Sequence, residues 1–195
     1  MCAIAKVLTK CMHDGQSRRV VEIREFYNDF KPPRYVRKLV ACLLSSVPEQ
    51  YLRGLDCVVL TNLAGAPRRD RTGKVTSRKR RVPQSQVFGR YHRAHHGKLP
   101  WIELYVDRLA AAASLAVAPF IKSSCFGLVL FHEIGHHIDA TIRPEFREKE
   151  DVADGWSKTL LRIYIRKRYP FPRPVMRVLG WMLKAMSQDL DHATF

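Results

Sequence analysis

Residues 128–138 read LVLFHEIGHHI, which has the pattern of a buried helix with a polar centre. Uncharged apolar residues flank its polar centre on both sides, as a buried helix requires. Ser123 and Ser124 stand just upstream, where serine commonly caps the start of a helix. The sequence therefore predicts a buried helix from about Cys125 to Asp139.

Two histidines in this helix are spaced to bind one metal ion. His132 and His136 lie four residues apart, so their side chains leave the helix on one face, one turn apart. Glu133 is rotated by about 100° from His132, which lets its carboxylate reach a water on the metal. If the histidines were merely packed side chains, Glu133 would be buried without an evident partner. We therefore predict that His132 and His136 are metal ligands and that Glu133 is a catalytic base.

A third protein ligand is expected downstream, because a catalytic zinc site uses three protein groups and a water. A third histidine is absent from the expected place: Asp139 and Ile142 stand where such a pattern has glycine and histidine. Carboxylates are the better candidates. We predict Glu150 as the third ligand, with Glu148 and Asp151 also within reach.

Asp154 is the predicted partner of the metal ligands. Glu150 and Asp154 lie four apart near the start of the next helix and share a face. If Glu150 binds the metal, Asp154 is placed to accept a ring N–H from a ligating histidine. Acidic residues at a helix start are also favoured by the helix dipole alone. The assignment therefore depends on whether Glu150 reaches both histidines.

The two motifs, His132 to His136 and Glu150 to Asp154, together resemble those of the gluzincin (thermolysin-like) zinc metallopeptidases. The chain looks most like their small single-domain forms, the minigluzincins, and the related regulator-cleaving peptidases of the ImmA/IrrE type. The resemblance covers about Trp101–Ile165. It implies one Zn²⁺ ion and a hairpin over Val87–Val106 just before the active-site helix. It also implies that Val87–His92 is an edge strand that pairs with an extended peptide.

The activity implied by this resemblance is hydrolysis of peptide bonds in a protein substrate. Zinc lowers the pKa of its bound water to about 7, and Glu133 would take the proton and pass it to the leaving amine. An oxyanion stabiliser is also expected, and the sequence leaves His137, Arg143 and Tyr164 open as candidates.

The remaining segments predict strands first and helices after them, which is the layout of an α+β fold. Besides the hairpin and the active-site helix, the predicted elements are strands at Val20–Phe26 and Leu55–Leu60 and helices at Arg34–Ser46, Ala110–Ala118, Pro144–Arg168 and Val175–Met186. With the resemblance, we expect a small zincin-like domain. Its short, mostly antiparallel-edged sheet would pack on the active-site helix and on the glutamate-bearing helix.

The 195 residues fit one domain with extensions. Residues 1–54 match no pattern and are predicted to be an N-terminal segment of unknown role. Residues 55–169 are the predicted metallopeptidase-like core, and residues 170–195 a C-terminal helical extension.

A formal net charge of +16 makes the chain strongly basic. Residues 68–81 hold eight basic residues and one acid, Asp70, and we predict a mobile, solvated loop there. The alternative function is a basic nucleic-acid-associated protein with a peptidase-like zinc site, either cutting DNA-bound proteins or serving as a non-catalytic interaction module. Its candidate contacts are Arg78, Lys79, Arg80 and Arg81.

The five cysteines are scattered, with no CxxC pair, and we expect them to be reduced thiols. The longest apolar stretch, Leu109–Ile121, contains Pro119 and is too short for a bilayer span. We therefore expect a soluble, cytoplasmic protein without a membrane segment.

Overall fold

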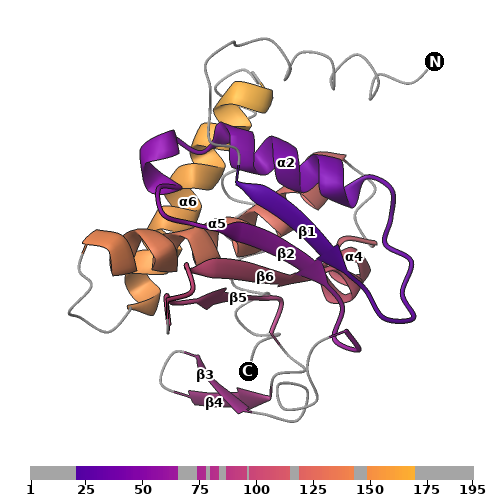
Figure 1. Ribbon diagram of the computed structural model, residues 1–195. Helices are drawn as coiled ribbons and strands as arrows, with labels where there is room; N and C mark the ends of the chain where they lie inside the picture. The colour runs from indigo at the N-terminus through magenta and orange to yellow at the C-terminus, as the bar shows by residue number, and fades with distance from the viewer. Residues whose placement is uncertain are drawn as a thin grey trace.

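The computed structural model describes residues 21–65, 74–77, 80–83, 87–95, 97–114, 119–142 and 149–169. Within these ranges the chain has an α+β fold, as predicted (Figure 1). Its elements are β1 (Glu22–Phe26), α2 (Val36–Ser46), the 3-10 helix η2 (Glu49–Tyr51), β2 (Cys57–Thr61), β3 (Lys74–Ser77), β4 (Arg80–Pro83), β5 (Gly89–His92), β6 (Trp101–Tyr105), α4 (Val106–Ser114), α5 (Pro119–Ile142) and α6 (Glu150–Arg168).

A four-stranded mixed sheet forms the centre of the fold, with the strand order β1-β2-β6-β5. β1, β2 and β6 are parallel neighbours, and β5 pairs antiparallel with β6. The predicted hairpin is therefore confirmed. Within the described residues β5 pairs with β6 alone, so it is an edge strand of the sheet, as the resemblance implied.

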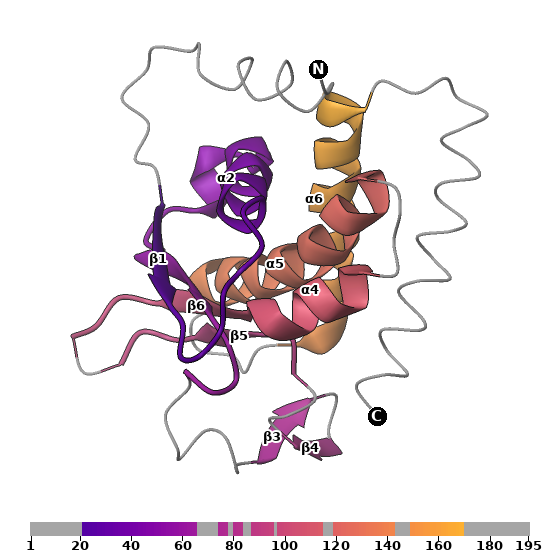
Figure 2. The same ribbon diagram turned by 90° about the vertical axis from the view of Figure 1, so that its right-hand side faces the viewer.

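The helices pack on one face of this sheet, and Figure 2 shows them together on one side of it. β2 and β6 direct Val58, Leu60, Ile102 and Leu104 into the core, where all four are fully buried. On α5 the fully buried side chains of Phe126, Leu130 and Ile134 recur every four residues. This spacing places them in one row along the helix, so α5 lies deep between the sheet and α6.

Residues 21–54 share this core. β1 pairs with β2 from Glu22 opposite Cys57 onward, and α2 buries Val36, Val40 and Leu43 in the same hydrophobic cluster as the rest of the chain. In the structure, the N-terminal segment from residue 21 onward is thus part of the same folded unit as residues 55–169.

Two predicted helix starts are wrong. α5 begins at Pro119, so Ser123 and Ser124 lie inside the helix, and both hydroxyls donate to the carbonyl of Phe120. Such a bond to the preceding turn satisfies serine within a helix, and proline fits the first helical position because its missing N–H would be unused there. α4 likewise begins at Val106, directly after β6, and not at Ala110.

α6 also starts later than predicted. Lys149 has an extended backbone (φ −111°, ψ 126°), so the helix begins at Glu150 and not at Pro144. Residues 143–148 lie outside the described part of the chain. Because of this start, Glu150 projects from the first turn of α6, where the positive end of the helix dipole favours a carboxylate.

The prediction of a loop over residues 68–81 is wrong where the structure describes it. β3 and β4 form an antiparallel ribbon that pairs Val75 with Val82 and Thr76 with Arg81. β-branched residues favour this conformation in spite of the many charges. The rest of the predicted loop and the predicted helix at Val175–Met186 lie outside the described residues. Among those described, none of the helices is long and apolar enough to cross a membrane.

Candidate metal centre

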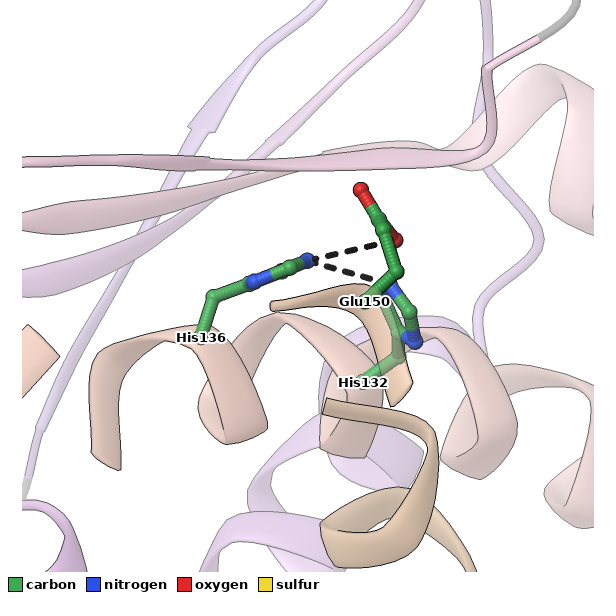
Figure 3. Close-up of side chains that lie close together, drawn as sticks. All are labelled: His132, His136 and Glu150. Atoms are coloured by element: carbon green, nitrogen blue, oxygen red, sulfur yellow. Dashed lines mark hydrogen bonds and ion pairs between the residues drawn. The ribbon is translucent and has the colours of Figure 1, made fainter. Parts of the chain in front are cut away.

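His132, His136 and Glu150 meet at the contact between α5 and α6 (Figure 3). The Nε2 atoms of the two histidines are 3.1 Å apart. Oε2 of Glu150 lies 3.3 Å from Nε2 of His132 and 3.7 Å from Nε2 of His136. Glu150 therefore reaches both histidines, as the predicted third ligand must.

These separations fit a single metal ion. Ligands bound tetrahedrally at 2.0–2.1 Å lie about 3.3 Å from one another. The three distances bracket this value, and three different side chains contribute one atom each. The group could therefore hold a metal ion with little rearrangement of its ligand atoms.

Asp154 orients the His132 ring through its Nδ1 atom, while its Nε2 atom faces His136 and Glu150. Its Oδ1 lies 2.9 Å from Nδ1 of His132, as predicted for the partner of a ligating histidine. Burial by itself lowers the pKa of His132, but hydrogen bonds to Asp154 and Glu150 outweigh it and raise the pKa to about 10. Burial likewise raises the pKa of Glu150, but the hydrogen bond with His132 outweighs it and lowers the pKa below its ordinary value. Without a metal, the proton on His132 and the charge on Glu150 stabilise each other.

This pairing predicts that metal binding releases a proton. At neutral pH, well below the pKa of about 10, His132 is protonated in the metal-free protein. Since a ligand nitrogen must be unprotonated, zinc binding should release about one proton or more, and the apparent affinity should rise by about tenfold per pH unit between pH 6 and 8. Titration calorimetry in buffers of different ionisation enthalpy measures the number. Asp154→Asn, which removes the charge that holds the proton, should release fewer protons, and near-zero release from the wild type would contradict the assignment.

His136 is held differently from His132. It is buried, and within the described part of the chain its Nδ1 has no hydrogen-bond partner. Its Nε2 faces His132 and Glu150, whereas the ring of His132 is also held at Nδ1 by Asp154.

Gly135 allows the two ligand-bearing helices to approach closely. A Cβ at this position would lie 2.8 Å from both the Cα and the carbonyl oxygen of Ala153 on α6. These are backbone atoms, so they cannot move without shifting α6. Glycine between the two histidines thus brings the first turn of α6, with Glu150, within reach of them.

Gly135→Ala should therefore damage the site. Alanine favours a helix by about 1 kcal/mol over glycine, but overpacking against Ala153 costs about 1–3 kcal/mol and displaces Glu150. We expect a lower melting temperature and weaker zinc binding. Gly155→Ala on α6 is the matched control, because a Cβ there meets nothing within 4 Å. Equal stability and zinc affinity in the two variants would exclude a tight contact at Gly135.

Glu133 lies under the edge strand. It is buried, and a Cβ on Gly89 of β5 would lie only 3.2 Å from its Cγ. The absence of a side chain at Gly89 therefore lets β5 cross close to α5 near the candidate metal ligands. The charge of Glu133 also helps to raise the pKa of His132, so this residue lies near a candidate ligand as well as beside β5.

His137 is a structural residue in this arrangement. Its Nε2 lies 3.1 Å from the carbonyl of Arg53 and its Nδ1 lies 3.3 Å from the hydroxyl of Tyr91. Because the carbonyl only accepts, Nε2 carries the proton, and the Tyr91 hydroxyl donates to Nδ1. Both nitrogens are occupied, and burial lowers the pKa of His137. Both nitrogens of His137, one of the predicted oxyanion stabilisers, are thus engaged with the turn at Arg53 and with Tyr91 of β5.

Among the residues that the structure describes, none of the other predicted site residues joins the group. Tyr164 is buried, with its ring against Phe131 and Tyr169, and lies about 21 Å along α6 from Glu150 at 1.5 Å per residue. It is too far away to stabilise an oxyanion at the metal. Arg143, Glu148, Arg78 and Lys79 lie outside the described residues, and Arg80 and Arg81 belong to β4.

Three residues near the centre were missed by the sequence interpretation: Gly89, Tyr91 and Asp139. A glycine inside a strand pattern often marks close approach of another segment, so the contact at Gly89 could have been predicted from the sequence. In the sequence, Asp139 stands out only as the residue at the place of the glycine in a three-histidine pattern. It is buried and accepts a hydrogen bond from the backbone N–H of Lys149.

Comparison with protein-family models, curated proteins and solved structures finds no match for this chain. The interpretation of the centre therefore depends on its geometry and on the chemistry of its donor atoms.

Proposed function

We propose that the protein is a zinc-dependent metallopeptidase that hydrolyses peptide bonds in a protein substrate. The convergence of His132, His136 and Glu150 at separations of 3.1–3.7 Å carries this proposal. Glu133, beside this group and beneath the edge strand, supports the catalytic part of it.

Zinc is the metal that the donor set favours. Two imidazole nitrogens and one carboxylate form a common catalytic zinc set, whereas magnesium and calcium prefer oxygen ligands alone. When bound, zinc would acidify a coordinated water and polarise the scissile carbonyl.

The residues of the chain divide the remaining work. His132, His136 and Glu150 would hold the metal, and Asp154 would keep the His132 ring in its ligating orientation. Glu133 takes a proton from the attacking water and delivers it to the departing amine. The amine then leaves uncharged, and the carboxylate is restored.

Peptide binding would use β5. An extended peptide can add to an edge strand through backbone hydrogen bonds. Such a strand beside β5 would pass close to Glu133, because β5 crosses α5 at Gly89. This arrangement supports a protein or peptide substrate over a small molecule.

The test is metal analysis combined with a hydrolysis assay. Purified protein should contain one zinc ion per chain and cleave casein or members of a peptide library. A chelator should abolish cleavage, and added zinc should restore it. Protein that takes up no zinc would refute the proposal, and protein that binds zinc but cleaves none of these substrates would refute its catalytic part.

A second candidate function, nucleic-acid binding, is supported by the exposed face of α6. Lys158, Arg162 and Arg166 follow one another at four-residue intervals and are all exposed. Like charges at this spacing destabilise a helix slightly, and a polyanion would relieve that repulsion. Their replacement by serine should lower the salt dependence of DNA binding by about three in logarithmic slope. Serine at the exposed Lys31, Arg34 and Lys38 gives the same charge change as a control. Equal effects would show that net charge alone attracts DNA.

A further inference from the structure

Asp139 connects the two helices that carry the metal ligands. It lies on α5 three residues after His136 and is 5% exposed. Its Oδ2 accepts a hydrogen bond of 3.2 Å from the backbone N–H of Lys149, the residue immediately before Glu150.

Two hydrogen bonds hold the backbone at the start of α6. The N–H of Lys149 bonds to Asp139 of α5, and its carbonyl bonds within α6 itself. The carbonyl of Lys149 accepts from the N–H of Ala153, the first such bond of α6. Ala153 in turn rests against Gly135 of α5. Glu150 thus lies between two attachments of α6 to α5, at Asp139 and at Gly135, one helical turn apart on each helix.

Two attachments restrict both the position and the rotation of the first turn of α6. The contact at Gly135 sets the distance between the helices, but by itself it leaves the end of α6 able to pivot or fray. Terminal helical turns fray readily, and Lys149 makes no side-chain cap bond. The bond to Asp139 holds the last backbone unit before the ligand.

We propose that Asp139 is a positioning residue that holds Glu150 in place for the metal. The inference rests on the proposed metal site but not on peptidase activity. Removing the acceptor should weaken zinc binding by about 10–100-fold, the range found when groups that orient metal ligands are lost.

The experiment compares the zinc affinity of full-length variants by competition with a chromogenic chelator, together with the melting temperature of each metal-free protein. Asp139→Ala removes the acceptor, and Asp139→Asn keeps an oxygen that can accept from Lys149. Ser157→Ala is the matched control, since the Ser157 hydroxyl donates to the carbonyl of Leu128 and joins the same two helices away from the ligands. If the alanine variant does not fold, Asp139→Leu fills the same space without an acceptor.

Asp139→Ala should lose zinc affinity, Asp139→Asn should recover most of it, and Ser157→Ala should bind zinc like the wild type even where its melting temperature falls. Wild-type affinity in Asp139→Ala would overturn the inference while leaving the metal site intact. Equal losses in Asp139→Ala and Ser157→Ala would overturn it too, because the effect would then be general destabilisation. A wild type that binds no zinc would overturn both the peptidase proposal and the role of Asp139. A wild type that binds zinc without cleaving peptides would refute only the peptidase, and the zinc affinities of the variants would still decide the role of Asp139.

Discussion

Glu133→Gln should reduce peptide hydrolysis by about 10²–10⁴-fold, the usual contribution of a general base. Glutamine has nearly the shape of glutamate, so the packing under Gly89 should be kept. It cannot take a proton from water at neutral pH. Zinc content should stay at the wild-type level, because Glu133 is not among the grouped ligands.

The control for this variant is Glu49→Gln, which makes the same chemical change at an exposed residue in η2. We expect it to hydrolyse peptides at the wild-type rate. If Glu133→Gln is as active as Glu49→Gln, the measured cleavage comes from another protein or from another base.

His136→Ala should lose zinc. Zinc binding in structural sites is worth about 10–16 kcal/mol, which is about 3 kcal/mol for each of four ligands, so one lost ligand weakens binding by roughly 100-fold or more. Metal analysis after dialysis should find the variant depleted of zinc. Hydrolysis should fall with the zinc content.

The neighbouring residue provides the control. His137→Ala removes the same side chain one position along α5, where the ring bonds to Arg53 and Tyr91. This variant should unfold at a lower temperature but bind zinc. If both alanine variants lost zinc equally, the effect of His136→Ala would reflect disruption of α5 in place of ligand loss.

The sequence predicted the type of most elements and misplaced several boundaries. Strongly periodic or β-branched runs, such as Leu55–Leu60, predict the type of element reliably, because a buried helix or strand has a regular pattern of apolar residues. Helix starts depend on local bonds that several residues can make. The sequence predicts Ser123 and Ser124 as caps, but in the structure their hydroxyls donate to a carbonyl of the preceding turn within α5.

The group of His132, His136 and Glu150 was predicted more fully than its surroundings. A spacing of four residues on a helix fixes a common face, so His132 with His136 and Glu150 with Asp154 could be paired from sequence alone. Contacts between distant segments leave no such periodic signal. The approach of Gly89 to Glu133 and the bond from Lys149 to Asp139 therefore appeared only in the structure.

The antiparallel contact of α5 with α6 has a consequence for how the chain folds. All three grouped ligands come from residues 132–150, a single helical hairpin, whereas the sheet must join β1 to β2 and β2 to β6 across long intervening segments. Local contacts form faster than distant ones because less chain entropy is lost in closing the loop. We therefore expect the hairpin to assemble before the parallel strands pair, with zinc favouring the early species. Pulse-labelling hydrogen exchange during refolding should then protect the amides of α5 and α6 ahead of those of β1 and β2.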